Sequence, residues 1–393
     1  LIPAAARSLQ PLSLPEVAEA DVVRHFTNLS TLNMSVDSHF YPLGSCTMKY
    51  NSKRNERMAG LAGLAHLHPY QPPSTLQGML QLLYELQQML AEISGLPCVS
   101  LQPAAGAHGE LTALMVAAAY FRDLGQSRTK VLTPDSAHGT NPASAILAGM
   151  NVVVIQCDKH GNIDFDDLKD KCEKYSKNLS CLMITYPSTH GVFEHHILEI
   201  TELIHKHGGL VYMDGANMNA QVGITNPKII GADVCHLNLH KTFCIPHGGG
   251  GPGMGPIGVV KKLVKYLPRN IFDDFDDSTI TPVSSAPYGS ASILAISYAY
   301  ISMMGSSALR HATELSILNA NYIRSRLENH YPILYKGVNG TSAHEFIIDC
   351  RDFKSDTDVE VEDIAKRLMD YGYHAPTVSF PVPGTMMIEP TES

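Results

Sequence analysis

Short, almost continuously apolar runs alternate with helical stretches between residues 98 and 260 of this chain. Such runs are typical of strands buried on both faces, and their alternation with helices predicts a mostly parallel central sheet with helices on both faces. The fold class expected is therefore α/β, with the functional groups in the loops that follow the carboxyl ends of the strands. The predicted strands are Val99–Gln102, Lys130–Thr133, Asn151–Gln156, Cys181–Tyr186, Gly209–Asp214, Asp233–Asn238 and Ile257–Val260.

The clearest helix is predicted over Leu76–Ser94, where apolar residues recur every three or four positions. Ser74 and Gln77 have the spacing of a capping box, and Gly95 supplies a left-handed stop. Four further helices are predicted in the gaps between strands, over Gly109–Leu124, Asn141–Met150, Asp164–Tyr175 and Ile197–His207.

At 393 residues the chain is too long for one minimal core, so we expect two structural units and an added arm. Residues 1–60 are rich in Pro, Ser and Asn and predict an N-terminal arm that wraps over another surface. Residues 61–290 would form the large domain and 291–393 a smaller C-terminal α/β domain, which ends abruptly and is expected to be truncated. Its predicted elements are helices Ser290–Met304, Ser307–Asn329 and Val359–Tyr371 and a strand over Glu345–Cys350.

The charge balance and the cysteines restrict the function classes. The chain has 29 lysines and arginines and 38 aspartates and glutamates, which gives a net charge of −9, and it has no basic block. This charge disfavours binding to nucleic acid or to anionic membranes. No run approaches the about 20 apolar residues of a membrane span. Eight scattered cysteines without a C-x-x-C pair, and no secretory signal, indicate reduced thiols in the cytosol or an organelle. We expect a cytoplasmic protein.

Two predicted strand ends carry small residues or a histidine. In the run PAAGAHGE, Ala105, Gly106 and Ala107 precede a helix, where bare backbone N–H groups can hold a phosphate without a positive side chain. An ordinary tight turn is the alternative interpretation. In PDSAHGTNPA, His138 stands just before a helix start, as a solvated histidine in a capping loop also would.

Two further strand ends carry an acid and an amine. Asp214 ends a strand of apolar residues, where a carboxylate is poorly solvated and requires a donor or cationic partner. Lys241 follows the next strand, beside a glycine-rich loop over 246–256; a lone lysine there is usually a surface lysine.

Together these strand ends offer a phosphate cradle, a flat stacking group, a buried acid and an amine. A pyridoxal phosphate (PLP) site requires this set: the lysine forms the Schiff base and the acid keeps the pyridine nitrogen protonated, so that the ring accepts electrons. Ala216, two residues after the acid, is small enough to let a ring lie flat against the chain.

The combined motifs resemble the glycine decarboxylase P-protein of the glycine cleavage system, and most of all the C-terminal subunit (subunit 2) of its two-subunit form. The runs that carry the resemblance are YPLGSCTMKYN, HLHPYQP, LQPAAGAHGE, PDSAHGTNPASA, TYPSTHGVFE, YMDGANMNAQVG, LNLHKTF, PHGGGGPGMGPIGV, PVSSAPYGSASI and TMMIEP. They are dense over residues 39–300 and extend to residue 390.

The resemblance implies an aspartate-aminotransferase-like PLP enzyme of fold type I and assigns roles by position. Lys241 matches the Schiff-base lysine, Asp214 the partner of the ring nitrogen, Ala216 the residue beneath the ring and His138 the stacking imidazole. The phosphate loop matches Ala105, Gly106 and Ala107, and two further positions around the cofactor match Thr189 and His240.

The resemblance also implies an activity and partners. The enzyme would be a glycine dehydrogenase (aminomethyl-transferring), which releases CO₂ from glycine and passes the aminomethyl group to the lipoyl cofactor of the H-protein. An N-terminal subunit (subunit 1) would complete an α₂β₂ heterotetramer. The glycine-rich loop after Lys241 would then give the lipoyl arm room or form a dimer contact. Lys49, Lys53, Arg54 and Arg57 form a basic run, which we interpret as a solvated face rather than a docking site for the H-protein.

Three other interpretations stay open at this point. A metal-dependent hydrolase would use some of the 19 histidines, of which His236 and His240 have i,i+4 spacing, but this pair falls on a strand and its exit. A stand-alone PLP amino-acid decarboxylase is the nearest enzymatic rival. A non-catalytic partner subunit would share the fold, although the presence of both Lys241 and Asp214 argues against it.

Overall fold

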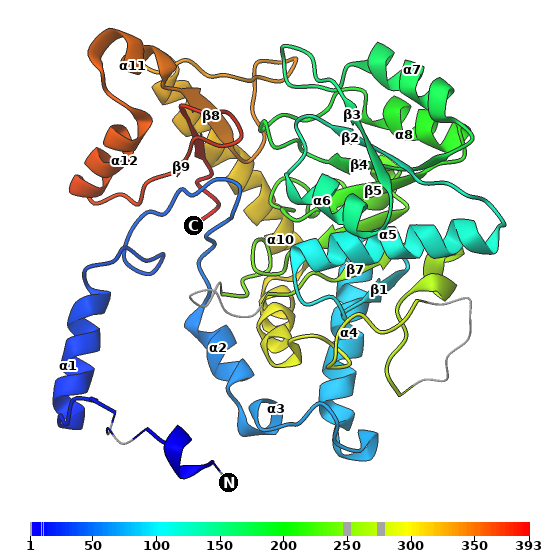
Figure 1. Ribbon diagram of the computed structural model, residues 1–393. Coiled ribbons are helices and arrows are strands. Elements are labelled where there is room, and N and C mark those ends of the chain that lie inside the picture. Colours follow the sequence, from blue (N-terminus) through cyan, green and yellow to red (C-terminus); the bar gives the residue numbers. More distant parts are fainter. Residues whose placement is uncertain (1, 9, 11, 247–252, 273–279) are drawn as a thin grey trace.

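The computed structural model describes residues 2–8, 10, 12–246, 253–272 and 280–393. Seven strands form the large sheet, in the order β1-β7-β6-β5-β4-β2-β3 (Figure 1). Neighbours from β6 to β3 are parallel, and β7 is antiparallel to both β6 and β1, so the sheet is mostly parallel as predicted. The strands are β1 (Cys98–Ser100), β2 (Lys130–Pro134), β3 (Asn151–Ile155), β4 (Leu179–Thr185), β5 (Leu210–Gly215), β6 (Val234–Leu237) and β7 (Ile257–Val259).

The predicted helices pack around this sheet because each presents an apolar face to it. α4 (Gln77–Ser94) buries Leu83, Leu86 and Leu90, and Gly95 ends the helix at a φ of 69°. The helices that follow the strands are α5 (Gly106–Asp123), α6 (Thr140–Leu147), α7 (Phe165–Tyr175), α8 (Ile197–Lys206) and α9 (Pro227–Ile230), with a 3-10 segment η3 (Lys261–Tyr266) after β7.

The predicted capping box at the start of α4 is wrong. Two consecutive prolines lead into a 3-10 turn, η2 (Pro73–Thr75), which takes up Ser74. Leu76 therefore occupies the cap position of α4, and no side chain caps the helix there. Ser74 and Gln77 do have the spacing of a capping box, but the 3-10 turn moves Ser74 away from the cap position of α4.

A second, smaller core lies against a three-stranded antiparallel sheet in the order β8-β10-β9. The long helix α10 (Ala291–Leu327) contributes to both cores and is interrupted at Gly305, which has a φ of 64° and a ψ of 176°. Two helices meeting near this glycine were predicted. β8 was also predicted, whereas the short β9 and β10 were not. The elements are β8 (Phe346–Asp349), α11 (Arg351–Thr357), α12 (Val361–Asp370), β9 (Thr377–Val378) and β10 (Thr385–Ile388).

α10 is long and apolar enough to cross a bilayer by length and composition alone, which the search for apolar runs did not anticipate. A core helix of a soluble protein passes the same test. Leu294, Ile296 and Tyr300 of this helix are buried in the larger core. The domain boundaries at residues 60 and 290 stay a prediction, because α10 joins the two cores without a linker.

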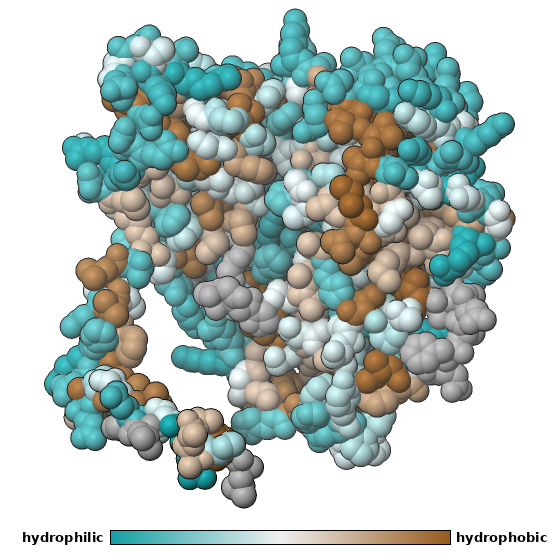
Figure 2. Space-filling model, viewed as in Figure 1, coloured by the Kyte–Doolittle hydropathy of each residue, from teal (hydrophilic) through white to brown (hydrophobic). Residues whose placement is uncertain are grey.

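The N-terminal segment has two parts with different surroundings. A 3-10 turn, η1 (Ala4–Ala6), and α1 (Glu19–Ser30) bury no residue and stand off from the body of the molecule (Figures 1 and 2). Residues 41–51, which we call the strap, run across the small sheet instead: Leu43 forms a bridge to Ile388 and the N–H of Gly44 donates to Met387 O (3.3 Å). Two short helices follow, α2 (Lys53–Ala59) and α3 (Ala62–Ala65).

The basic run at the end of the strap is only partly a solvated face. The residues on α2, Lys53, Arg54 and Arg57, are exposed, as predicted. Lys49 is buried, and its Nζ lies 2.9 Å from Glu392 Oε1 and 3.3 Å from the hydroxyl of Tyr300. Burial alone would lower the pKa of Lys49, but Glu392, Tyr300 and Cys244 together outweigh it and raise that pKa. For Lys49 the interpretation as a surface charge was wrong.

Candidate active site

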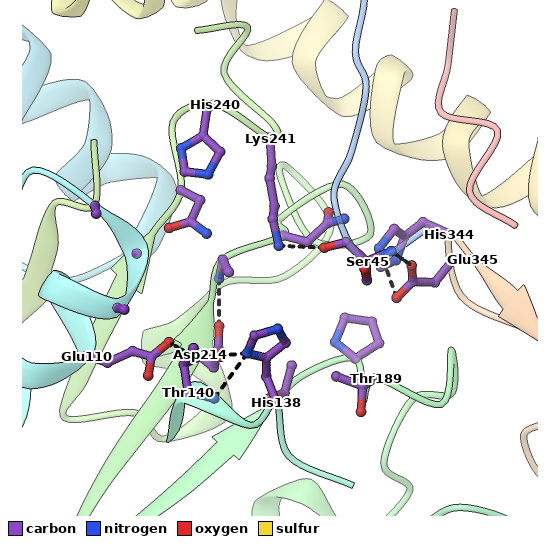
Figure 3. A pocket seen from close by; sticks show the side chains of 18 of the residues that line it. Ser45, Glu110, His138, Thr140, Thr189, Asp214, His240, Lys241, His344 and Glu345 are labelled. Carbon is purple, nitrogen blue, oxygen red and sulfur yellow. Dashed lines mark hydrogen bonds and ion pairs between the residues drawn. The ribbon is translucent and has the colours of Figure 1, made fainter. Parts of the chain in front are cut away.

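A cavity of about 300 Å³ opens at the carboxyl ends of the large sheet (Figure 3). It draws on the loops after β1, β2, β4, β5 and β6, together with the strap and the segment before β8. Loops after parallel strands meet at one edge of a sheet, which is why residues far apart in sequence lie together here. The cavity is lined by every residue that the sequence singled out for the cofactor: Ala105, Gly106, Ala107, His138, Thr189, Asp214, Ala216, His240 and Lys241.

The loop after β1 packs closely against its neighbours, and no side chain covers its backbone N–H groups at the start of α5. A Cβ built on Gly106 would lie 2.5 Å from Asn238 Oδ1, so only glycine fits without moving that side chain. Ala105 caps the helix and no side chain occupies the cap. An 18-residue helix beginning in a cavity attracts an anion through its first N–H groups and its dipole. The cradle therefore suits a phosphate.

Lys241 reaches the cavity from the turn after β6. Its Nζ donates to the carbonyl of Ser45 (2.7 Å), a residue of the strap with a φ of 61°. The N–H of Ser45 in turn donates to Glu345 Oε2 (3.0 Å). Lys241 is the single lysine or arginine among the described residues around this cavity. The amine is thus held at a defined place by backbone that comes from the other end of the chain.

Asp214 ends β5 and is 4% exposed, as its apolar strand predicted. Its Oδ1 accepts from the N–H of Ala216 (3.0 Å) and lies 3.7 Å from Nε2 of His236. The side-chain amide of Asn141, in its hydrogen-bonding orientation, donates to Asp214 Oδ2 (3.2 Å). These donors hold the carboxylate of Asp214 at the wall of the cavity. Among the described lining residues, Lys241 is the one lysine or arginine that can balance its charge.

The remaining predicted residues are held by polar contacts around the same space. Nδ1 of His138 contacts Thr140 Oγ1 (2.8 Å), and burial lowers the pKa of His138. The hydroxyl of Thr189 donates to the carbonyl of Ser136. His240 lines the cavity beside Lys241 (Figure 3). The geometry therefore brings the predicted set together, while the role of each residue stays a prediction.

Sequence reasoning missed an acid in this site. Glu110 is 4% exposed, and its carboxyl group is hydrogen-bonded to the hydroxyls of Thr140 (2.7 Å) and Ser144 (3.1 Å). Burial, and then repulsion by Asp214, raise the pKa of Glu110 to about 7. A signal was available, because Glu110 stands four residues after Gly106 and so shares the face of α5 that carries the cradle.

The other missed lining residues come from the strap and from the segment before β8. Ser45, His344 and Glu345 line the cavity, and no local pattern marked them. The buried residues also include two groups of three acids and histidines, the residue types that bind metals. Within each group, one side-chain oxygen or nitrogen atom per residue lies within 4.8 Å of the others. The two groups are Glu110, Asp214 and His236, and His344, Glu345 and Glu389.

Buried polar atoms of the lining test the fit of a cofactor. Within the described part of the chain, Oδ1 of Asn238 and Oγ1 of Thr185 are among those that form no hydrogen bond. A buried polar group is normally satisfied, so these atoms indicate that a polar ligand belongs in the cavity. With the phosphate cradle, the anion at Asp214 and the amine at Lys241, the lining fits PLP.

Comparison with known proteins decides the family. Residues 1–282 match the family model described as "Glycine cleavage system P-protein", and residues 312–393 match "Glycine dehydrogenase, C-terminal domain". The chain belongs to the glycine cleavage system P-protein family. Glycine dehydrogenase (decarboxylating) of Nitrobacter winogradskyi is 56% identical over 378 residues, and that of Nostoc punctiforme 55% over 381. Each alignment covers 96% of this chain but only 40% and 39% of those P-protein relatives, so the chain spans about two fifths of their length.

Solved structures share the architecture of this P-protein chain. Glycine decarboxylase (P-protein) of the glycine cleavage system, in inhibitor-bound form, superposes with a TM-score of 0.78 at 18% identity, covering 98% of this chain and 88% of that one. Alanine–glyoxylate aminotransferase from Nostoc sp. gives 0.64 at 13% identity, with 91% of each chain covered. The fold is that of the PLP-dependent transferases of fold type I, as the sequence predicted.

Proposed function

We propose that this chain carries the PLP-dependent glycine-decarboxylating site of a glycine cleavage P-protein. The observation that carries the proposal is the single cavity that Lys241, Asp214 and the cradle at Gly106 share. The relatives named glycine dehydrogenase (decarboxylating) support glycine as the substrate. Decarboxylation of glycine best explains a PLP-type cavity in a member of the glycine cleavage P-protein family.

Each residue has a definite task in this proposal. The N–H groups at the start of α5 would hold the phosphate, His138 would pack on one face of the ring and Ala216 would leave space at the other. Lys241 would provide the covalent attachment, and Asp214 would keep the ring nitrogen protonated. When bound, PLP supplies an electron-poor ring that accepts the electron pair released as the carboxylate of glycine departs.

The protein itself controls the position of the amine. When Lys241 is not engaged, its Nζ rests on the carbonyl of Ser45, 2.7 Å away, so the strap provides a fixed resting place inside the cavity. Glu345 holds the strap in turn through the N–H of Ser45. Glycine has no side chain to orient it, so a fixed set of surrounding groups must do so.

The second half of the reaction defines the macromolecular partner. Glycine, one proton and the lipoyl disulfide give CO₂, one S-aminomethyl group and one free thiol. The electron pair of the bond to the carboxylate reduces the disulfide. The proposed acceptor is the lipoylated H-protein, whose arm would enter the cavity. Residues 247–252 of the glycine-rich loop over 246–256, which would give this arm room, lie outside the described residues.

The decisive experiment is covalent trapping of the cofactor. Reconstituted protein treated with borohydride should carry a pyridoxyl group on Lys241, located by peptide mass spectrometry. Lys241→Ala should lose the label and the exchange of ¹⁴CO₂ with glycine, whereas Lys159→Ala, at an exposed lysine, should keep both. A label elsewhere, or exchange that survives in Lys241→Ala, refutes the proposed site.

The same preparation separates a P-protein from a stand-alone decarboxylase. A P-protein should form little free methylamine from glycine, and added lipoylated H-protein should increase turnover strongly. Brisk methylamine release without H-protein would favour the stand-alone enzyme.

We further infer an assembly with an N-terminal P-protein subunit (subunit 1) as an α₂β₂ heterotetramer. Its support is the resemblance of the sequence motifs to subunit 2 of the two-subunit form. Native mass spectrometry of the co-expressed subunits would give the stoichiometry. Within the described part of the chain, the seven cysteines from Cys98 to Cys350 are free thiols, which suits a reducing compartment such as the cytoplasm.

A further inference from the structure

A buried hydrogen-bonded chain connects Glu110 on α5 to His138 on the loop before α6. Oε1 of Glu110 lies 2.7 Å from Oγ1 of Thr140, and the same Oγ1 lies 2.8 Å from Nδ1 of His138 (Figure 3). The backbone N–H of Thr140 also points at Nδ1 of His138, at 3.3 Å. Thr140 therefore touches the histidine through two atoms and the acid through one.

The direction of these bonds follows from counting hydrogens. A backbone N–H can only donate, so Nδ1 of His138 must carry a lone pair and accept. The contact between this lone pair and Thr140 Oγ1 then requires the hydroxyl hydrogen of Thr140. That hydroxyl has no second hydrogen to give. It can donate to Oε1 of Glu110 when Nδ1 of His138 carries a hydrogen, whereas a bare Nδ1 that takes the hydroxyl hydrogen requires a hydrogen on Oε1 of Glu110.

The other oxygen of Glu110 agrees with this direction. Its Oε2 accepts from the hydroxyl of Ser144 (3.1 Å) and, once the amide of Asn141 is turned so that its nitrogen faces the carboxyl groups, from that nitrogen (3.0 Å). The carbonyl oxygen of a neutral acid can accept both bonds. With the proton on Oε1, every contact of this carboxyl group is satisfied, and the hydroxyl hydrogen of Thr140 stays available to Nδ1 of His138.

The surroundings of Glu110 keep that proton in place near neutrality. The side chain is buried, and Asp214 and His236 lie close enough that ligand atoms of the three are within 4.8 Å of one another. Burial and then repulsion from Asp214 raise the pKa of Glu110 to about 7; Lys241 opposes them more weakly. His138 itself tends to stay neutral, because burial lowers its pKa.

We propose that Glu110 is a positioning residue which, as a neutral acid, acts through Thr140 to place the ring hydrogen of His138 on Nε2. The inference rests on the proposed function, in which His138 packs on the cofactor ring. The two bonds from Thr140 hold the imidazole in one orientation and one tautomer. Loss of the proton from Glu110 turns the hydroxyl of Thr140 toward the carboxylate. The hydrogen of His138 then moves to Nδ1, where it donates to Oγ1 of Thr140, and the longer contact from the N–H of Thr140 (3.3 Å) is given up.

The test is the tautomer of His138 in cofactor-free protein, measured by NMR of ¹⁵N-labelled histidine side chains. His138→Gln assigns the signal among the 19 histidines. In the wild type, Nδ1 should be bare at pH 6.5, and the share with hydrogen on Nδ1 should rise to a majority by about pH 8. Glu110→Gln keeps a donor toward Thr140 and an acceptor toward Ser144, so Nδ1 should stay bare across this range.

Three further variants make the result specific. Thr140→Val removes the connecting hydroxyl and should abolish the pH-linked change, and Thr140→Ser should restore it. Glu199→Gln changes an exposed acid that contacts a different histidine, His196, and should leave the His138 signal as in the wild type.

A protonated Nδ1 in the wild type at pH 6.5, or a Glu110→Gln protein that changes tautomer like the wild type, overturns the proposal. Because no cofactor is present, this outcome is independent of the trapping experiment at Lys241. In reconstituted protein, the pH profile of CO₂ exchange should lose its limb near pH 7 in Glu110→Gln and keep it in Glu199→Gln.

Discussion

Glu389, at the end of β10, joins the strap to the loop after β5, and its removal should destabilise the fold measurably. It is fully buried, and its Oε1 accepts hydrogen bonds from the side chains of Thr47 (2.7 Å), Asn217 (2.9 Å) and Asn219 (3.0 Å). Three donors from two distant parts of the chain thus converge on one oxygen. The alanine variant would leave all of them without that acceptor.

The size of the effect can be worked out from these contacts. Three hydrogen bonds to a carboxylate, at about 1.5–3 kcal/mol each, set an upper range of roughly 5–9 kcal/mol. Asn217 and Asn219 also donate to Thr47 Oγ1, at 2.7 and 3.3 Å, so they keep one partner after the substitution. We therefore expect Glu389→Ala to lower the free energy of unfolding by about 3–5 kcal/mol. Glu389→Gln keeps one acceptor oxygen and should lower it by about 1–2 kcal/mol.

Urea unfolding followed by circular dichroism measures both variants against Glu202→Ala, which removes an exposed glutamate of α8. The alanine variant should shift the midpoint most, the glutamine variant less, and the control hardly at all. An alanine variant within about 1 kcal/mol of the control would refute the reasoning, because that is the spread of ordinary surface substitutions.

Two further predictions concern the cradle and the acid stability of the large sheet. A Cβ on Gly255 would lie 2.1 Å from the carbonyl oxygen of Ala105, so Gly255→Ala should displace the phosphate cradle. We expect it to weaken PLP binding at least tenfold in equilibrium dialysis. Gly253→Ala, whose Cβ would meet nothing closer than 3.5 Å, should bind PLP normally. Burial alone would raise the pKa of Asp233, but hydrogen bonds from His205 and Lys262 outweigh it and lower that pKa. Its stabilising contribution is therefore complete above the unfolded pKa of about 4 and is lost as the pH falls through the folded value. Asp233→Asn should flatten the dependence of Tm on pH between about 4 and 2, and a slope equal to that of the wild type would contradict this assignment.

The parts of the fold that repeat a local pattern could be predicted from the sequence. All seven strands of the large sheet lie where apolar runs predicted them, with ends shifted by no more than two residues. β9 was missed, since a strand of two residues is too short to show a period. β10 was missed although it is as long as β6 and β8, which were predicted. α1 was missed although Val22, Phe26 and Leu29 recur at helical spacing, and the structure leaves all three exposed.

The candidate site divides in the same way. Asp214, Lys241 and His138 follow parallel strands, so sheet topology alone places them at one edge. Glu110 lies one helical turn beyond the cradle and could have been found by that spacing. Ser45 could not, because its contact with Lys241 spans 196 positions and depends on how the strap crosses the small sheet.

That contact has a consequence for how the two cores work together. The amine of Lys241 rests on the carbonyl of Ser45, and the N–H of Ser45 is bound by Glu345, which immediately precedes β8 of the small sheet. Two residues further along the strap, Thr47 is bound by Glu389 at the end of β10. The resting place of the amine is thus built by the small core and presented to a cavity in the large one. Because buried polar contacts of this kind are lost together rather than singly, a substitution that loosens the small sheet should also displace the strap and disturb Lys241, although it touches no residue of the large sheet.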